Sequence, residues 1–187
     1  PKGLAQAFAS VKTVMTYAPI RAVTMLGLGL GFIQLGLATY LVVFLWKEVG
    51  YTLAQAGLIF STLHISGIVA RLVLGAIADT LVPAKWVLVG LAVALSGALV
   101  MMMQLDAGWP VGMVYALIAL VGATANAWVG LYFAELARLA PPGQLAAITG
   151  GSQFFTFGGL VVGPTVFGLV LQFTDSYQIC FALLAVV

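Results

Sequence analysis

The stretch AVTMLGLGLGFIQLGLATYLVVFLW, residues 22–46, contains no charged side chain and is long enough to span a membrane. A helix needs roughly 20 consecutive apolar residues to cross the hydrocarbon core of a bilayer. Further apolar runs of comparable length occupy residues 49–70, 86–105, 107–134 and 139–174. Because these runs are continuously apolar, without the alternation of a barrel strand, they predict membrane-spanning helices.

The composition agrees with this interpretation. Of the 187 residues, 63% are hydrophobic and 6% are charged, whereas about a quarter are charged in a typical soluble domain. So few charges cannot cover the apolar surface with a polar shell, and the expected solvent is lipid. A net charge of +2 without a basic cluster argues against a nucleic-acid partner. The single cysteine, Cys180, permits no intrachain disulfide or cysteine metal cluster, and we expect no metal and no cofactor.

A last apolar run begins at Tyr177 and brings the predicted number of helices to six. Within the run before it, the Pro141–Gly143 turn places the start of a helix near Gln144. After Asp175 the remaining residues extend about 18 Å as a helix, less than the roughly 30 Å of a bilayer core. The predicted fold is therefore all-α: a six-helix transmembrane bundle over residues 21–187, cut from a longer protein and with its last helix truncated.

Residues 1–20 are only modestly apolar. They contain Lys2 and Lys12 and end in Pro19, just before Arg21 and the first spanning run. This pattern predicts a cytoplasmic interfacial segment or a linker. A flexible tail is an alternative of equal weight.

The basic residues of the connections predict the orientation of the bundle. One side carries Lys2, Lys12, Arg21, Lys85 and Arg138, whereas the other carries only Lys47. Because short cytoplasmic loops are rich in lysine and arginine, both chain ends are expected in the cytoplasm. We expect a multi-pass protein of a bacterial inner (plasma) membrane.

The connection between the second and third predicted helices reads GAIADTLVPAK, residues 75–85. It resembles the signature loop of the major facilitator superfamily, in which an aspartate follows a glycine by four residues and basic residues come next. Gly75, Asp79 and Lys85 match this pattern. The positions that depart from it are Thr80, Val82 and Pro83.

A second stretch, GGLVVGPTVFG at residues 158–168, resembles the glycine-proline helix of the same family. The four-residue spacing of Gly159 and Gly163 allows helix backbones to approach closely, and Pro164 bends its helix. Ordinary close packing explains these residues equally well. Six helices with the two motifs in this order resemble one half of such a transporter, and the lysine-bearing leader favours the C-terminal half.

The resemblance implies secondary active transport of a small solute by alternating access, with or without coupling to a proton or ion. The cavity would lie between this half and a missing N-terminal half, or between two copies of this half. A six-helix channel or a non-transporting structural module is the alternative. We do not expect an enzyme, because the chain lacks metalloprotease and phosphate-loop motifs and its one histidine has no carboxylate within a helical turn.

Four polar residues near the middle of the spans are the candidates for substrate binding: Gln34, His64, Asn126 and Gln153. The amides either line a polar cavity or form hydrogen bonds between helices. His64 lies about 18 Å along its helix from Thr52, and an ionisable group at that depth suggests a function. A neutral histidine bonded to a carbonyl, or to Ser61 or Thr62, is the alternative.

A second group of residues is expected to control conformation. We expect Arg71, Asp79 and Glu135 to form a gate network at the cytoplasmic end of the bundle. The other candidates for gating are Gly75, Lys85, Gly159, Gly163 and Pro164. The candidates for aromatic cavity walls are Tyr40, Trp128, Phe154 and Phe155. No carboxylate lies near a span centre, so proton coupling would depend on His64 or on the other half.

Overall fold

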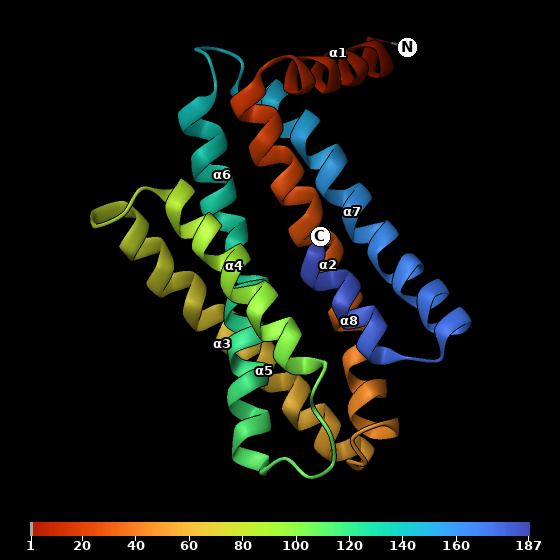
Figure 1. Ribbon diagram of the computed structural model, residues 1–187. Helices are drawn as coiled ribbons and strands as arrows, with labels where there is room; N and C mark the ends of the chain where they lie inside the picture. Colours follow the sequence, from red (N-terminus) through yellow and green to blue (C-terminus); the bar gives the residue numbers. More distant parts are fainter. Residues whose placement is uncertain (1) are drawn as a thin grey trace.

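The computed structural model describes residues 2–187, with side chains from residue 8 onward. Within this range the chain forms helices joined by short turns and contains no strand, which confirms the predicted all-helical fold (Figure 1). The helices are α1 (Lys2–Thr16), α2 (Ala18–Lys47), α3 (Leu53–Thr80), α4 (Ala84–Met102), α5 (Val111–Asn126), α6 (Trp128–Leu139), α7 (Leu145–Thr174) and α8 (Tyr177–Val186).

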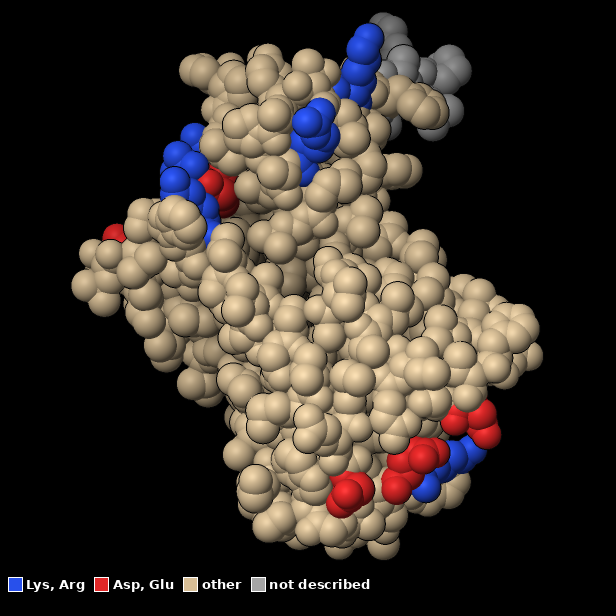
Figure 2. Space-filling view, viewed as in Figure 1, with Lys and Arg blue, Asp and Glu red and all other residues tan. Residues whose placement is uncertain are grey.

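Five helical stretches in the described chain are long and apolar enough to cross a membrane: α2, α3, α4, α7 and the combined α5–α6 stretch. The sixth predicted span, α8, has 10 residues and extends only about 15 Å. Charged side chains gather at the two ends of the molecule and leave an uncharged belt between them on the face seen in Figure 2. The fold is that of a multi-pass α-helical membrane protein.

Local sequence explains several helix boundaries. The Thr52 hydroxyl accepts a hydrogen bond from the Gln55 N–H, and the Gln55 side chain accepts one from the Thr52 N–H, so α3 begins with a capping box. Gly143 has a φ of +77°, which favours glycine, and forms the expected turn before α7. The predicted start near Gln144 agrees with the observed start at Leu145.

One feature was not predicted: the run 107–134 does not form one continuous helix. The chain breaks at Ala127, which divides the fourth span into α5 and α6. Irregular backbone inside a bilayer persists only where other groups satisfy its polar atoms. Here side chains from two other helices do so.

Two close helix pairs form the body of the bundle, α2 with α7 and α3 with α5. A Cβ atom added to Gly159 would overlap the carbonyl oxygen of Leu28, and one added to Gly163 would overlap that of Phe32. A Cβ atom on Gly122 would likewise overlap the carbonyl oxygen of Leu63. Glycine therefore brings the backbones of both pairs together, as small residues do at interfaces between membrane helices.

The N-terminal helix α1 lies across the ends of α2 and α7 (Figure 1). Val14 is fully buried, and a Cβ atom on Gly151 would lie 2.6 Å from the carbonyl oxygen of Ser10. The described part of the leader is thus a helix packed against α7. The next helix begins at Ala18, before the boundary predicted after residue 20. The side chain of Lys2 lies outside the described residues.

Candidate functional site

The break between α5 and α6 is held by hydrogen bonds from two other helices. Asn126, the last residue of α5, accepts a bond of 2.8 Å at Oδ1 from Gln34 Nε2 and donates a long one of 3.5 Å to the Leu63 carbonyl. Arg71 Nη2 donates to the backbone carbonyl of Asn126 at 2.9 Å. A cation at a helix C-terminus also interacts favourably with the helix dipole. We call Gln34, Asn126, Arg71 and the Leu63 carbonyl the break network.

Next to this network lies a cavity of about 310 Å³, which we call the central cavity. Its walls come from α2, α6 and α7. The lining residues are Gln34, Trp128, Val129, Tyr132, Phe133, Gln153, Thr156, Phe157 and Leu160. On its inner wall Thr156 Oγ1 donates to the Tyr132 hydroxyl at 3.1 Å. The lining combines amides, hydroxyls and aromatic rings, and none of the lining residues is charged.

Trp128 is a buried wall residue with an unusual polar atom. Its indole Nε1 is buried and has no hydrogen-bond partner among the described residues. An unpaired buried donor costs about 1–3 kcal/mol. The ring packs edge-on against Tyr132, with centroids 5.5 Å apart. The cavity wall thus contains one unsatisfied hydrogen-bond donor.

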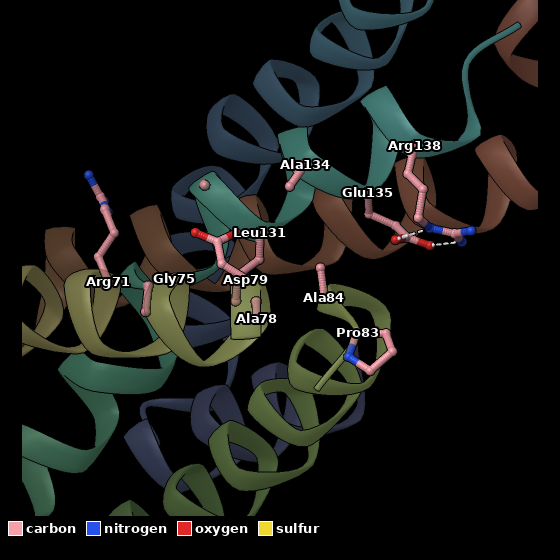
Figure 3. A pocket seen from close by; sticks show the side chains of 12 residues that line it. Arg71, Gly75, Ala78, Asp79, Pro83, Ala84, Leu131, Ala134, Glu135 and Arg138 are labelled. Carbon is pink, nitrogen blue, oxygen red and sulfur yellow. Dashed lines mark hydrogen bonds and ion pairs between the residues drawn. The ribbon is translucent and has the colours of Figure 1, made fainter. Parts of the chain in front are cut away.

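A second cavity, of about 420 Å³, lies between α3, α4 and α6 near the end of the bundle where those helices meet their connections. We call it the end cavity (Figure 3). Four charged residues line it, Arg71, Asp79, Glu135 and Arg138, beside small residues of α6. Glu135 is buried and accepts two bonds from the more exposed Arg138, at 2.5 and 2.8 Å. This arrangement neutralises the buried carboxylate within its own helix.

The predicted gate network among Arg71, Asp79 and Glu135 is not formed in the described structure. Glu135 pairs with Arg138, which lies three residues later on the same helix face. Arg71 instead binds the carbonyl exposed by the helix break, and in Figure 3 it points away from both acids. Asp79 is exposed and lies beside Leu131 (Figure 3). The three residues line one cavity without bonding to one another.

His64 lies apart from the three amide candidates. Its side chain is exposed on α3 and meets the ring of Phe60 edge-on at 4.7 Å. The hydroxyls of Ser61 and Thr62 donate to carbonyls of their own helix, and no bond between either of them and His64 is formed within residues 8–187. Gln34 and Gln153 share the central cavity, and Gln34 bonds to Asn126. The structure therefore brings three of the four candidates together and leaves His64 outside.

The remaining gating candidates take different positions. Gly75 lines the end cavity. The amine of Lys85 lies over the ring of Trp86, 5.4 Å from its centroid. Pro164 lies inside α7, one residue after a glycine contact with α2.

Of the four aromatic candidates, only Trp128 lines the central cavity. Tyr40 stacks on Phe167 with centroids 4.6 Å apart. Phe154 is exposed on α7 and contacts Phe155 edge-on. Three of the four rings therefore lie on packing or outer faces rather than in the cavity wall.

Three of the polar residues that line the two cavities were absent from the prediction: Tyr132, Thr156 and Arg138. Helical spacing offered a signal for two of them, because Tyr132 follows Trp128 by four residues and Thr156 follows Gln153 by three. Residues at these spacings share a helix face. Arg138 follows Glu135 by three residues, so a pair within this helix was a stronger expectation than a pair between helices.

No family model matches this chain, and no curated protein matches it significantly. Among the described residues, no group of three or more histidine, cysteine or acidic side chains is placed to hold a metal ion. The geometry defines a multi-pass membrane protein with a neutral cavity beside a broken span and a charged cavity at one end.

Proposed function

We propose that this chain is one half of a secondary transporter of the major facilitator type, which moves a small solute by alternating access. The observation that carries the proposal is the broken span beside a polar cavity. Transporters commonly bind solutes near the bilayer midplane, where helices are discontinuous. Asn126 lies about 22 Å along the span Val111–Leu139, near its middle. A solute in the central cavity would lie at this depth.

The outer faces of the bundle support a two-part architecture. The spans α3 and α7 are the least buried of the five. Both display large apolar side chains, among them Leu72 and Val73 on α3 and Val161 and Phe173 on α7. Lipid covers part of this surface. A missing N-terminal half, or a second copy of this half, covers the part that faces the solute pathway.

Orientation and coupling complete the proposal. The end that carries Lys12, Arg21, Lys85 and Arg138 faces the cytoplasm of a bacterial cell, by the positive-inside rule. The central cavity contains no carboxylate, so a coupled proton would be carried by His64 or by the other half. The end cavity then acts as the cytoplasmic gate, in which Asp79 stabilises one of the two conformations.

A channel and a structural module are the rival functions. Access to the central cavity distinguishes each of them from a transporter. The test places one cysteine at Gln153→Cys in a Cys180→Ala background, in sealed vesicles treated with a membrane-impermeant methanethiosulfonate. Alternating access predicts labelling from each side, because the cavity opens to the two sides in turn. A structural module predicts labelling from neither side.

The gate is tested in the same background with Asp79→Asn. Loss of a cytoplasmic gate contact should raise labelling of position 153 from the basic end at least threefold and lower labelling from the other end. The matched control is Asp106→Asn at the opposite end, where the carboxylate bonds locally to the Gly108 N–H. If labelling from the two sides rises or falls together, a channel is favoured and the transport proposal fails.

A further inference from the structure

We infer that the central cavity selects an uncharged solute that both donates and accepts hydrogen bonds, an inference that rests on the proposed transport function. The polar part of its lining consists of two amides, Gln34 and Gln153, and two hydroxyls, Tyr132 and Thr156. An ion moved from water into this site would lose its hydration without gaining a counter-charge. The lining therefore disfavours carboxylates, phosphates and ammonium groups.

The polar groups of the cavity offer both kinds of hydrogen bond. Gln34 uses Nε2 on Asn126, which leaves its Oε1 as an acceptor. Gln153 forms no hydrogen bond within residues 8–187, so its amide can donate and accept. The hydroxyls of Tyr132 and Thr156 bond to each other, and Tyr132 also bonds to the side chains of Ser152 and Thr24, so the two amides carry the free donors and acceptors of the cavity. Hydroxyl and amide groups of a solute, which also do both, complement this set.

The apolar part of the lining adds a requirement for shape. The rings of Trp128, Phe133 and Phe157 line the same cavity as the two amides. Aromatic rings pack favourably against a flat apolar face. A volume of about 310 Å³ is at the small end of the range for ligand pockets, roughly 300–1,000 Å³. The solute class is thus a small uncharged molecule with hydroxyl or amide groups and an apolar face.

The charges of the molecule lie elsewhere, which strengthens this assignment. Arg71, Asp79, Glu135 and Arg138 line the end cavity, not the central one. His64 is exposed on α3 and does not line the central cavity either. An approaching ion would meet opposite charges in the end cavity and none among the residues that line the central cavity.

Trp128 provides a reporter for the test, because the other tryptophans can be removed. The triple variant Trp46→Phe, Trp86→Phe, Trp109→Phe leaves one indole, in the wall of the central cavity. The purified protein is titrated with two matched sets: glucose, gluconate and glucosamine, and uridine with uridine monophosphate. We expect a neutral member to shift or quench Trp128 emission at least tenfold more tightly than its charged relatives.

A preference below tenfold, or no response to any neutral member, overturns the inference. The variant Gln153→Leu should weaken the neutral ligand about tenfold. The matched control Gln172→Leu removes an exposed amide from the same helix, outside the cavity, and should leave affinity unchanged. Equal effects of the two variants would also overturn the assignment.

Uptake of the same solutes into proteoliposomes separates the two proposals. A neutral solute that binds at Trp128 but is not taken up would refute transport and leave the cavity assignment in place. Saturable uptake of a charged member in preference to its neutral relative would refute the cavity assignment and leave transport in place. Uptake of the neutral member alone supports both.

Discussion

Both close helix pairs bring their backbones together through glycine, but different polar groups surround the two contacts. In both pairs a glycine faces a backbone carbonyl, Gly159 against Leu28 between α7 and α2, and Gly122 against Leu63 between α5 and α3. Within residues 8–187 the side-chain hydrogen bond between α2 and α7 is a buried hydroxyl contact, Thr24 Oγ1 to Ser152 Oγ at 2.9 Å. The α3–α5 pair lies at the helix break and carries the amide and guanidinium bonds of the break network.

This difference assigns the two pairs different roles in a moving bundle. Backbone contact through glycine is common to both pairs, so the difference between them lies in their polar bonds. Amide and guanidinium bonds can exchange partners while remaining satisfied, which the bilayer interior requires. We therefore expect α2–α7 to move as one body and the break network to rearrange.

The largest effect is expected from Gly159→Leu. The added side chain would overlap the Leu28 carbonyl, so α2 and α7 must separate along their length. Such overpacking against backbone should lower the free energy of unfolding by about 3 kcal/mol or more. Denaturation in mixed detergent micelles measures the change.

The adjacent Gly158→Leu is the matched control, because a Cβ atom there has nothing within 4 Å. Its free energy of unfolding should change by no more than about 0.5 kcal/mol. Similar losses in the two variants would show that the contact with α2 does not determine the result, because leucine has a higher helix propensity than glycine and propensity cannot explain a loss. The expectation that α2 and α7 move as one body would then fail.

Sequence predicted the parts of this architecture that depend on local pattern. Continuous apolar runs predict spans because a helix in lipid must satisfy its own backbone hydrogen-bonding groups. The spacing of Gly159 and Gly163 predicts a close contact face. The break at Ala127 escaped prediction because it depends on Arg71 and Gln34, which are remote in sequence. The sequence marks polar residues at mid-span. Which of them share the central cavity depends on packing between helices that are remote in sequence, and this was not predictable.

A smaller loss of stability is expected from Asn126→Leu. The change removes the acceptor of Gln34 and the donor to the Leu63 carbonyl. Hydrogen bonds between membrane helices contribute about 0.6–2 kcal/mol each, so we expect a loss of about 1–2 kcal/mol in the same denaturation assay. The variant Gln34→Leu removes one of the two bonds and should cost about half as much. If Asn126→Leu has no greater effect than Gln34→Leu, the break network does not hold the span.

The smallest effect concerns the hydroxyl contact between Thr24 and Ser152, both fully buried. A double-mutant cycle of Thr24→Val and Ser152→Ala isolates their interaction from the packing change of each substitution. We expect a coupling energy near 0.6 kcal/mol, the average for such bonds between membrane helices. In a rigid α2–α7 pair this bond only satisfies two buried polar groups. Its coupling energy should therefore stay below that of Gln34 with Asn126, which the same kind of cycle measures with leucine substitutions. A larger coupling at Thr24–Ser152 would mean that the hydroxyl bond, and not the glycine contact, joins α2 to α7.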